Sequence, residues 1–221
     1  MALTKQKLKN FKAILFDMDG VLIDSMPYHY ISWFETLKKY NARITAADIF
    51  EMEGAKWDKI VRLAFKRENK VLSKDLAMKI CDERKNLFRQ SIKKYIFEGI
   101  EDFLKKLKAK GFLLGLVSGS SLQEAENMLP KNIIGKFDVK VTGDMVKKGK
   151  PHPEPYLTAA KKLSISAKDC LVIENAPYGI KSAKSAKMCC IAIETSLQKH
   201  NLSKADLIFA NHKKLYRYFG M

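Results

Sequence analysis

The sequence predicts an α/β protein with an open sheet of parallel strands and a helical insertion after the first strand. Short apolar runs, each followed by a helical pattern, recur along the chain. Continuous apolar runs are typical of parallel strands covered by helices on both faces, and the alternation of strand and helix argues for an open α/β sheet. One interval, from Asp17 to about Phe112, is far longer than the roughly 30 residues that a strand-to-strand crossover needs.

Six segments are predicted to be strands, at residues 13–16, 112–117, 137–142, 170–173, 189–193 and 207–209. Helices are expected between them, for example at residues 100–110, closed by Gly111 as a C-terminal cap. A second is expected at residues 155–163, with Pro155 in its first turn.

The long interval holds helical patterns at residues 28–40, 56–67 and 73–94 and no convincing strand. We therefore predict two domains, an α/β core formed by residues 1–26 and 95–221 and an α-helical cap formed by residues 27–94. An insertion at this point would lie over the carboxyl ends of the strands, where open α/β sheets bind ligands.

The composition limits the classes of function and the cellular locations that we expect for the protein. The 221-residue chain is 47% hydrophobic, which is enough for a good core. It has no stretch near the roughly 20 apolar residues that span a bilayer, and its polar, Lys-rich start is unlike a signal peptide. We expect a cytoplasmic protein without a membrane partner.

The net charge of +17 raises the question of an anionic partner. The lysines are scattered along predicted helices at spacings of three or four residues, which is the pattern of a solvated face. We therefore expect no nucleic-acid partner. The four cysteines lack zinc-ligand spacing, and we interpret Cys81, Cys170, Cys189 and Cys190 as reduced core residues.

The loops that leave four of the predicted strands carry acidic, basic or hydroxyl side chains. In chain order they are Asp17 and Asp19, then Ser118, then Lys150, then Glu174 and Asn175. Taken singly, each loop also fits a turn or a helix cap. Their joint appearance, each at a strand exit, indicates an active site at one edge of the sheet.

Asp17 and Asp19 are the most informative pair. A strand places residues i and i+2 on the same side, so we expect both carboxylates to point to one place while Met18 faces away. Two carboxylates this close repel unless a cation lies between them or one keeps its proton. Such a pair suits Mg²⁺ binding and a division into nucleophile and acid/base.

These motifs resemble those of the haloacid dehalogenase-like (HAD) superfamily of phosphohydrolases over nearly the whole chain. The first motif is matched by residues 17–20, the second by Ser118, the third by Lys150 within residues 149–155, and the fourth by Glu174 and Asn175. The resemblance implies a Rossmann-like core. The insertion resembles the small α-helical cap of the branch that contains β-phosphoglucomutase and sugar-phosphate phosphatases.

The resemblance implies a role for each catalytic residue. Asp17 would attack the phosphoryl group and form an aspartyl phosphate. Asp19 would act as general acid toward the leaving alcohol and then as general base toward water. Lys150 would neutralise phosphoryl charge, and Ser118 would hold a phosphoryl oxygen.

The resemblance also implies substrate-binding and metal-binding groups. The substrate-binding groups would be the backbone N–H of Met18 or Gly119, with Ser120, His29 and Lys56. The Mg²⁺ ligands would be the Asp17 carboxylate, the Asp19 carbonyl, Glu174 and Asn175, completed by phosphate and water. The resemblance suggests that His29 is a hinge residue that hydrogen-bonds Asp19 or the substrate, although a partly exposed helix histidine fits equally well.

The chain departs from the family pattern at two places. Asn175 stands where this branch often has a second metal-binding carboxylate, which lowers the charge offered to a cation. The loop of residues 53–56 resembles a substrate-specificity loop, but Lys56 and Trp57 stand in the region where the glucomutase branch has an arginine. The second departure weakens the mutase interpretation.

We therefore expect a monomeric, Mg²⁺-dependent HAD phosphatase that acts on a small phosphorylated metabolite, such as a sugar phosphate. One alternative is a β-phosphoglucomutase-like phosphotransferase, which would return the phosphoryl group to a sugar instead of water. The other alternative, motivated by Asn175, is a catalytically weak protein that binds a phosphorylated ligand.

Overall fold

A computed structural model describes residues 3–221 and contains a single six-stranded parallel sheet. The strands are β1 (Ala13–Phe16), β2 (Leu113–Val117), β3 (Val139–Val141), β4 (Cys170–Glu174), β5 (Cys189–Ile193) and β6 (Leu207–Phe209). Their order in the sheet is β3-β2-β1-β4-β5-β6, and all neighbouring pairs are parallel. The predicted fold class is confirmed. The order reverses between β1 and β4, and such a reversal marks the ligand-binding edge of an open α/β sheet.

The strand bounds differ slightly from the prediction at three places, the first being β2, which begins at Leu113 and not at Phe112. The predicted strand at 137–142 is shorter, because the ring of Phe137 is buried against the edge of Phe16 and Thr142 begins a 3₁₀ turn, η1 (Gly143–Met145). The strand β4 is one residue longer and includes Glu174. The acidic side chain is therefore fixed by the sheet and does not lie in a turn.

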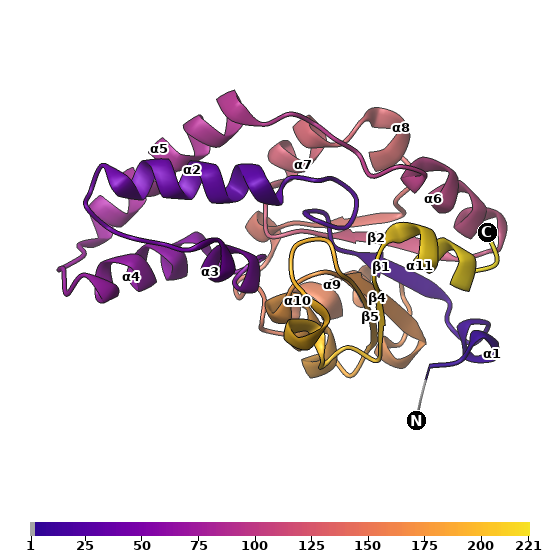
Figure 1. The fold of residues 1–221 in the computed structure, drawn as a ribbon. Coiled ribbons are helices and arrows are strands. Elements are labelled where there is room, and N and C mark those ends of the chain that lie inside the picture. Colours follow the sequence, from indigo (N-terminus) through magenta and orange to yellow (C-terminus); the bar gives the residue numbers. More distant parts are fainter. Residues whose placement is uncertain (1–2) are drawn as a thin grey trace.

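Alternate side chains of β1 pack into two separate apolar clusters, one on each face of the sheet. Ile14 and Phe16 belong to the first cluster, and Ala13 and Leu15 belong to the second. The first face is covered by α6 (Ile100–Ala109), α7 (Leu122–Met128), α8 (Lys131–Ile134) and α11 (His212–Tyr218). The second face is covered by α9 (Glu154–Lys162) and α10 (Pro177–Ser185), as Figure 1 shows. A further short helix, α1 (Lys5–Leu8), precedes β1.

The insertion after β1 forms four helices with an apolar cluster of their own. They are α2 (Met26–Lys38), α3 (Ala46–Glu51), α4 (Trp57–Arg67) and α5 (Lys74–Ser91). Figure 1 shows them set to one side of the sheet. The sequence pattern had not indicated α3, which begins with a capping box between Thr45 and Asp48. On this basis we propose the division into a core and a cap at the predicted boundaries.

The two chain segments that connect core and cap run side by side. The backbone N–H of Asp24 donates to the carbonyl of Tyr95 at 2.8 Å, and the N–H of Phe97 donates to the carbonyl of Leu22 at 3.1 Å. Ile23 and Ile96 form an isolated antiparallel bridge between them. These residues therefore form the natural hinge for any movement of the cap.

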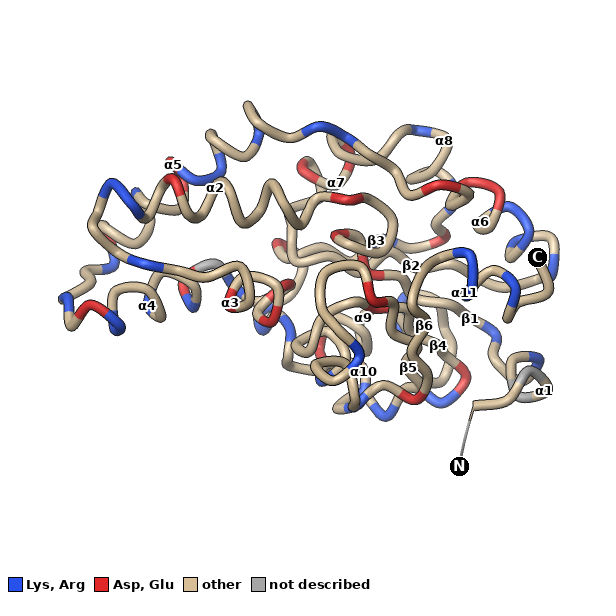
Figure 2. Tube along the Cα trace, viewed as in Figure 1, with Lys and Arg blue, Asp and Glu red and all other residues tan. Residues whose placement is uncertain are grey.

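The charged residues are spread over the helices of both parts, as Figure 2 shows for Lys, Arg, Asp and Glu. Within residues 3–221, every helix is too short or too polar to cross a membrane. The four cysteines are free thiols, as predicted, and Cys81, Cys170 and Cys190 are buried. Cys189 is half-buried and packs at the margin of the first apolar cluster, on the opposite face of the sheet from Cys190, which corrects its assignment as a fully buried core residue.

Candidate active site

The loop after β1 directs Asp17 and Asp19 to different partners. The N–H of Asp17 still donates to the carbonyl of Ile173 on β4, at 3.0 Å. The chain then turns back, with the N–H of Leu22 donating to the carbonyl of Met18 at 2.9 Å and with Gly20 at φ 78°, a conformation that favours glycine. Extended geometry ends at Phe16, but Asp19 still lies close enough to Asp17 for repulsion between the two carboxylates to contribute to the raised pKa of Asp17.

Lys150 joins the carboxylates of two neighbouring strands. Its Nζ atom lies 2.5 Å from Asp17 Oδ1 and 2.7 Å from Glu174 Oε1. All three side chains are buried, and that of Lys150 is 1% exposed. An ammonium in this position attracts both carboxylates and fixes their orientation.

Glu174 is held by four hydrogen-bond donors. Lys150 Nζ and the hydroxyl of Tyr156 donate to Oε1, the second at 2.8 Å. The N–H groups of Asn175 and Ala176 donate to Oε2 at 2.9 Å and 3.2 Å. These bonds occupy most of the accepting capacity of the carboxylate, so Glu174 acts mainly as a fixed counter-charge to Lys150.

Asp19 faces the hinge side of the site. Its Oδ1 accepts a hydrogen bond from Ser25 Oγ at 2.5 Å and lies 3.1 Å from His29 Nε2. Ser25 is the N-cap residue of α2, but its hydroxyl is directed to Asp19 and not to the helix N–H groups. The structure thus brings His29 to Asp19, as the resemblance suggested.

The cap is closed over the carboxyl ends of the strands. Gly54 of the cap lies against Gly119 of the core, where an added Cβ on Gly119 would come within 3.0 Å of the Gly54 Cα. A Cβ on Gly54 would lie 2.5 Å from Lys150 Cδ. Glycine at these two positions therefore allows the closest approach of cap and core.

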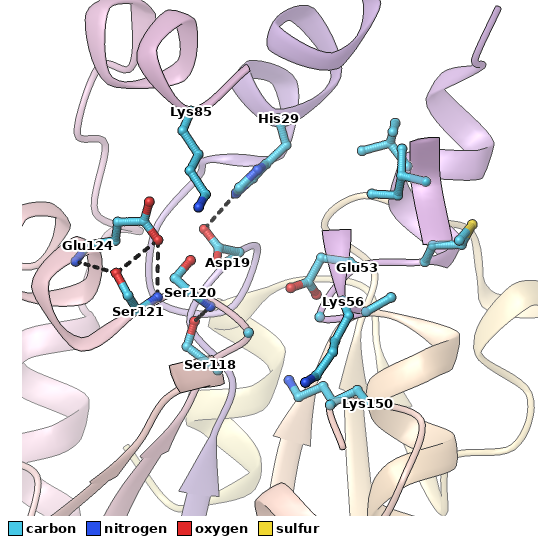
Figure 3. A pocket seen from close by; sticks show the side chains of 18 of the residues that line it. Asp19, His29, Glu53, Lys56, Lys85, Ser118, Ser120, Ser121, Glu124 and Lys150 are labelled. Carbon is cyan, nitrogen blue, oxygen red and sulfur yellow. Dashed lines mark hydrogen bonds and ion pairs between the residues drawn. The ribbon is translucent and has the colours of Figure 1, made fainter. Parts of the chain in front are cut away.

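A cavity of about 370 Å³ lies between the cap and the strand ends. The predicted residues Asp19, His29, Lys56, Ser118, Gly119, Ser120 and Lys150 line it. Figure 3 shows Asp19 and His29 together, Ser118 and Ser120 below them, and Lys56 beside Lys150. Ser118 is not a helix cap, because Ser121 is the N-cap of α7. The side chain of Met18 is buried in the core, so its backbone is the part available to a ligand.

The buried charges of the site do not balance. Burial raises the pKa of Asp17 to about 7, although Lys150 opposes this shift, and repulsion by Glu174 and Asp19 adds to it. Burial also raises the pKa of Glu53 well above its usual range, with a contribution from repulsion by Asp17. The attraction of Asp17, Glu174 and Glu53 outweighs burial and raises the pKa of Lys150. Three carboxylates surround one ammonium, which favours a further cation.

The donor atoms of the site fit a hard cation such as Mg²⁺. One carboxylate oxygen each of Asp17, Glu53 and Glu174 lies within 4.8 Å of the others. Among the described residues, none offers a hydrogen-bond partner to Asp17 Oδ2, Glu53 Oε2 or the side-chain amide of Asn175, all of which are buried. Unpartnered buried oxygens are costly unless a ligand occupies them, and magnesium prefers oxygen ligands.

Several residues around the site were not foreseen. Glu53 is a potential metal ligand from the cap, whereas the sequence placed it only in a specificity loop. Tyr156 and Ser25 orient Glu174 and Asp19 through their hydroxyl groups, and neither residue was among the predicted site residues. Asn175 lies against Gly20, beside the loop that carries the two aspartates, so its predicted place in the site agrees with the structure.

An α/β core with a closed helical cap and a buried Lys–carboxylate centre defines an enzyme-like site at the strand ends. The family model described as haloacid dehalogenase-like hydrolase matches residues 14–193. The chain therefore belongs to the haloacid dehalogenase-like hydrolases, and the predicted family is confirmed.

Curated relatives cover most of the chain. A phosphorylated carbohydrates phosphatase from Thermotoga maritima is 30% identical over 182 residues, which is 79% of this chain and 81% of the relative. The β-phosphoglucomutase of Bacillus subtilis is 28% identical over 204 residues, or 89% of this chain and 88% of the relative.

A solved structure shows the same architecture. The crystal structure of β-phosphoglucomutase from Clostridium difficile superposes with a TM-score of 0.80 at 27% identity, covering 95% of this chain and 97% of that one.

Proposed function

We propose that the protein is a Mg²⁺-dependent phosphatase that hydrolyses a small phosphorylated sugar through an aspartyl phosphate on Asp17. The observation that carries the proposal is the buried centre in which Lys150 contacts Asp17 and Glu174 beside unpartnered carboxylate oxygens. The relatives described as phosphatases of phosphorylated carbohydrates and hexitols support the reaction class and the substrate class.

In the first step, an oxygen of Asp17 forms a bond to phosphorus and the bond from phosphorus to the sugar oxygen breaks. Asp19 gives a proton to that sugar oxygen, so the leaving group departs as an alcohol. In the second step, water attacks phosphorus and gives a proton to Asp19, and the bond from phosphorus to Asp17 breaks. Inorganic phosphate leaves, and both aspartates return to their starting states.

The remaining residues bind and orient the phosphoryl group. Lys150 contributes a fixed positive charge next to Asp17. The hydroxyl of Ser118 and the backbone N–H groups of Met18 and Gly119 hold phosphoryl oxygens, with Ser120 at the edge of the cavity. The closed cap excludes bulk water from the leaving-group side.

A metal ion would be held by Asp17, Glu53 and Asn175, with Glu174 beside them. The Asp19 carbonyl is the further ligand that the family resemblance implies. When bound, Mg²⁺ would neutralise phosphoryl charge and offset the repulsion among the buried carboxylates. The cap lysine Lys56, which lines the cavity, suits an anionic sugar phosphate.

The β-phosphoglucomutases among the relatives favour one alternative, transfer of the phosphoryl group to a sugar. Both activities use the same phosphorylated aspartate and differ in the acceptor. Release of free phosphate in proportion to substrate loss distinguishes hydrolysis, whereas conservation of total sugar phosphate distinguishes transfer.

The test is a screen of phosphate release from a panel of phosphorylated sugars and sugar alcohols, with Mg²⁺ and with a chelator. We expect turnover of at least one compound with Mg²⁺ and loss of turnover with the chelator. The proposal would be overturned if the protein binds these compounds but neither releases phosphate nor transfers a phosphoryl group. That result would support the alternative of a catalytically weak binding protein.

A further inference from the structure

The turn that follows Asp19 is bound to the core by two side-chain donors. Thr195 Oγ1, in the loop after β5, donates to the carbonyl of Gly20 at 2.7 Å. His212 Nε2, in the first turn of α11, lies 2.7 Å from the carbonyl of Val21. A carbonyl only accepts hydrogen bonds, so the imidazole must carry a proton on Nε2 and donate it. Two consecutive carbonyls of one turn are therefore held by two core segments that lie outside the four motifs.

His212 also contacts the second connecting segment of the hinge. Its ring is buried and stacks on the ring of Phe97, with centroids 4.2 Å apart and planes at 26°. The N–H of Phe97 in turn donates to the carbonyl of Leu22, the neighbour of Val21. One side chain thus holds both connecting segments to α11 where they leave the core.

The two aspartates depend on this turn to different degrees. Asp17 is held by its N–H, which donates to β4, and by Lys150, and neither bond involves the turn. Asp19 directly precedes Gly20, so the turn sets the place from which its side chain reaches the cavity. Loss of either donor would leave a carbonyl of a buried residue without that partner and allow the turn to shift. Such a shift would move Asp19 more than Asp17.

We propose that Thr195 and His212 are positioning residues for the acid/base step: together they hold the turn after Asp19 to the core and so keep the Asp19 carboxyl within reach of the leaving group. This inference rests on the proposed function, because it requires Asp19 to be the general acid. Neither residue contacts the reacting atoms in the proposed mechanism. Both act through the backbone of the turn, and a displacement of about 1 Å at a reacting group can lower a rate about 100-fold.

The kinetic test compares two leaving groups in variants that remove one donor and little volume. A weakly basic nitrophenolate departs with little help from an acid, whereas a sugar alkoxide needs a proton. For Thr195→Val and for His212→Phe we expect kcat for the best sugar phosphate of the screen to fall roughly tenfold or more, with KM little changed, and kcat for 4-nitrophenyl phosphate to fall less than about threefold. Thr195→Ser, which keeps the hydroxyl, and His212→Gln, which keeps an N–H donor, should recover most of the loss.

A double variant distinguishes a joint role from two separate ones. Because both donors hold the same turn, loss of the second should add less once the first is gone. We expect the loss of kcat on the sugar phosphate in Thr195→Val/His212→Phe to be clearly smaller than the product of the two single losses. A loss equal to that product would show that the two residues act independently and would overturn the joint anchor.

The matched control is Tyr218→Phe, also on α11, which removes a hydroxyl that donates to the carbonyl of Leu3 at 2.9 Å. Both substrates should be unaffected by it. Equal losses on both substrates in Thr195→Val and His212→Phe would assign these residues a structural role only and overturn the inference. If the wild type hydrolyses neither substrate, the proposed function fails instead, which keeps the two failures distinct.

Amide hydrogen exchange tests the anchor without a measurement of turnover. The N–H of Leu22 donates to the carbonyl of Met18 within the turn, so its exchange rate reports whether the turn keeps its shape. In Thr195→Val and His212→Phe this exchange should be about tenfold faster than in the wild type, while the N–H groups of β4 exchange at the wild-type rate. Unchanged exchange at Leu22 in both variants would contradict the proposed anchor.

Discussion

Lys150 Nζ lies 2.5 Å from Asp17 Oδ1 and thereby joins a residue of the third motif to the proposed nucleophile. The same nitrogen contacts Glu174, so a single buried ammonium is shared by two carboxylates at the ends of adjacent strands. Breaking a buried charge pair by removing one partner leaves an uncompensated charge, which costs far more than an exposed pair contributes. Lys150 should therefore contribute to both stability and turnover.

Lys150→Met, which preserves length and removes the charge, should lower kcat/KM for phosphate release by about 100-fold or more. Thermal or denaturant melts should show a loss of roughly 3–5 kcal/mol of stability without metal. Added Mg²⁺ should stabilise the variant more than the wild type, because it replaces part of the missing positive charge. Lys161→Met, at an exposed position of α9, is the control, and equal behaviour of the two variants would show that Lys150 is a surface lysine in solution.

Glu53→Gln should raise the Mg²⁺ concentration that gives half-maximal activity by about tenfold, since one ligand charge near the cation is lost. Without metal, the variant should melt no lower than the wild type, because it relieves repulsion with Asp17. The stabilisation of the fold by Mg²⁺ should shrink. Glu51→Gln, an exposed residue of the same loop region, is the control. Superimposable Mg²⁺ titrations for Glu53→Gln and wild type would exclude Glu53 as a ligand.

Asn175→Asp should lower the half-maximal Mg²⁺ concentration, because it adds a charge at nearly unchanged geometry, and Asn175→Ala should raise it. Turnover need not rise with affinity, since another carboxylate also repels the incoming phosphate. Asn86→Asp, exposed on α5, controls for a general effect of added charge. Three identical Mg²⁺ titrations for wild type, Asn175→Asp and Asn175→Ala would show that Asn175 does not bind the metal.

The sheet could be predicted from the sequence because buried parallel strands are continuous apolar runs. The gathering of Asp17, Ser118, Lys150 and Glu174 followed from the same pattern, since each residue lies at or beyond the end of a strand and parallel strands end at one edge. The predicted strand at residues 137–142 was longer than β3 because Phe137 is apolar for a reason other than strand formation. Its ring packs against Phe16.

The remaining features depend on tertiary structure. The different hydrogen-bond partners of Asp17 and Asp19 depend on how the chain turns at Gly20. The place of Glu53 depends on how far the cap closes over the sheet, and the contact of His212 with Val21 depends on where α11 packs. Local periodicity contains no information on either arrangement.

The most direct test of the account is to trap the phosphoryl group on Asp17. Wild type and Asp17→Asn are each mixed with Mg²⁺ and the best sugar phosphate, and the reaction is quenched rapidly in acid. Borohydride then converts any aspartyl phosphate to homoserine. Mass spectrometry of the peptides locates the homoserine. The account predicts homoserine at residue 17 in the wild type, and in Asp17→Asn neither homoserine nor phosphate release, with the melting temperature preserved. The aspartyl-phosphate mechanism would be contradicted if Asp17→Asn released phosphate at the wild-type rate. It would also be contradicted if the wild type turned over substrate while residue 17 stayed unmodified.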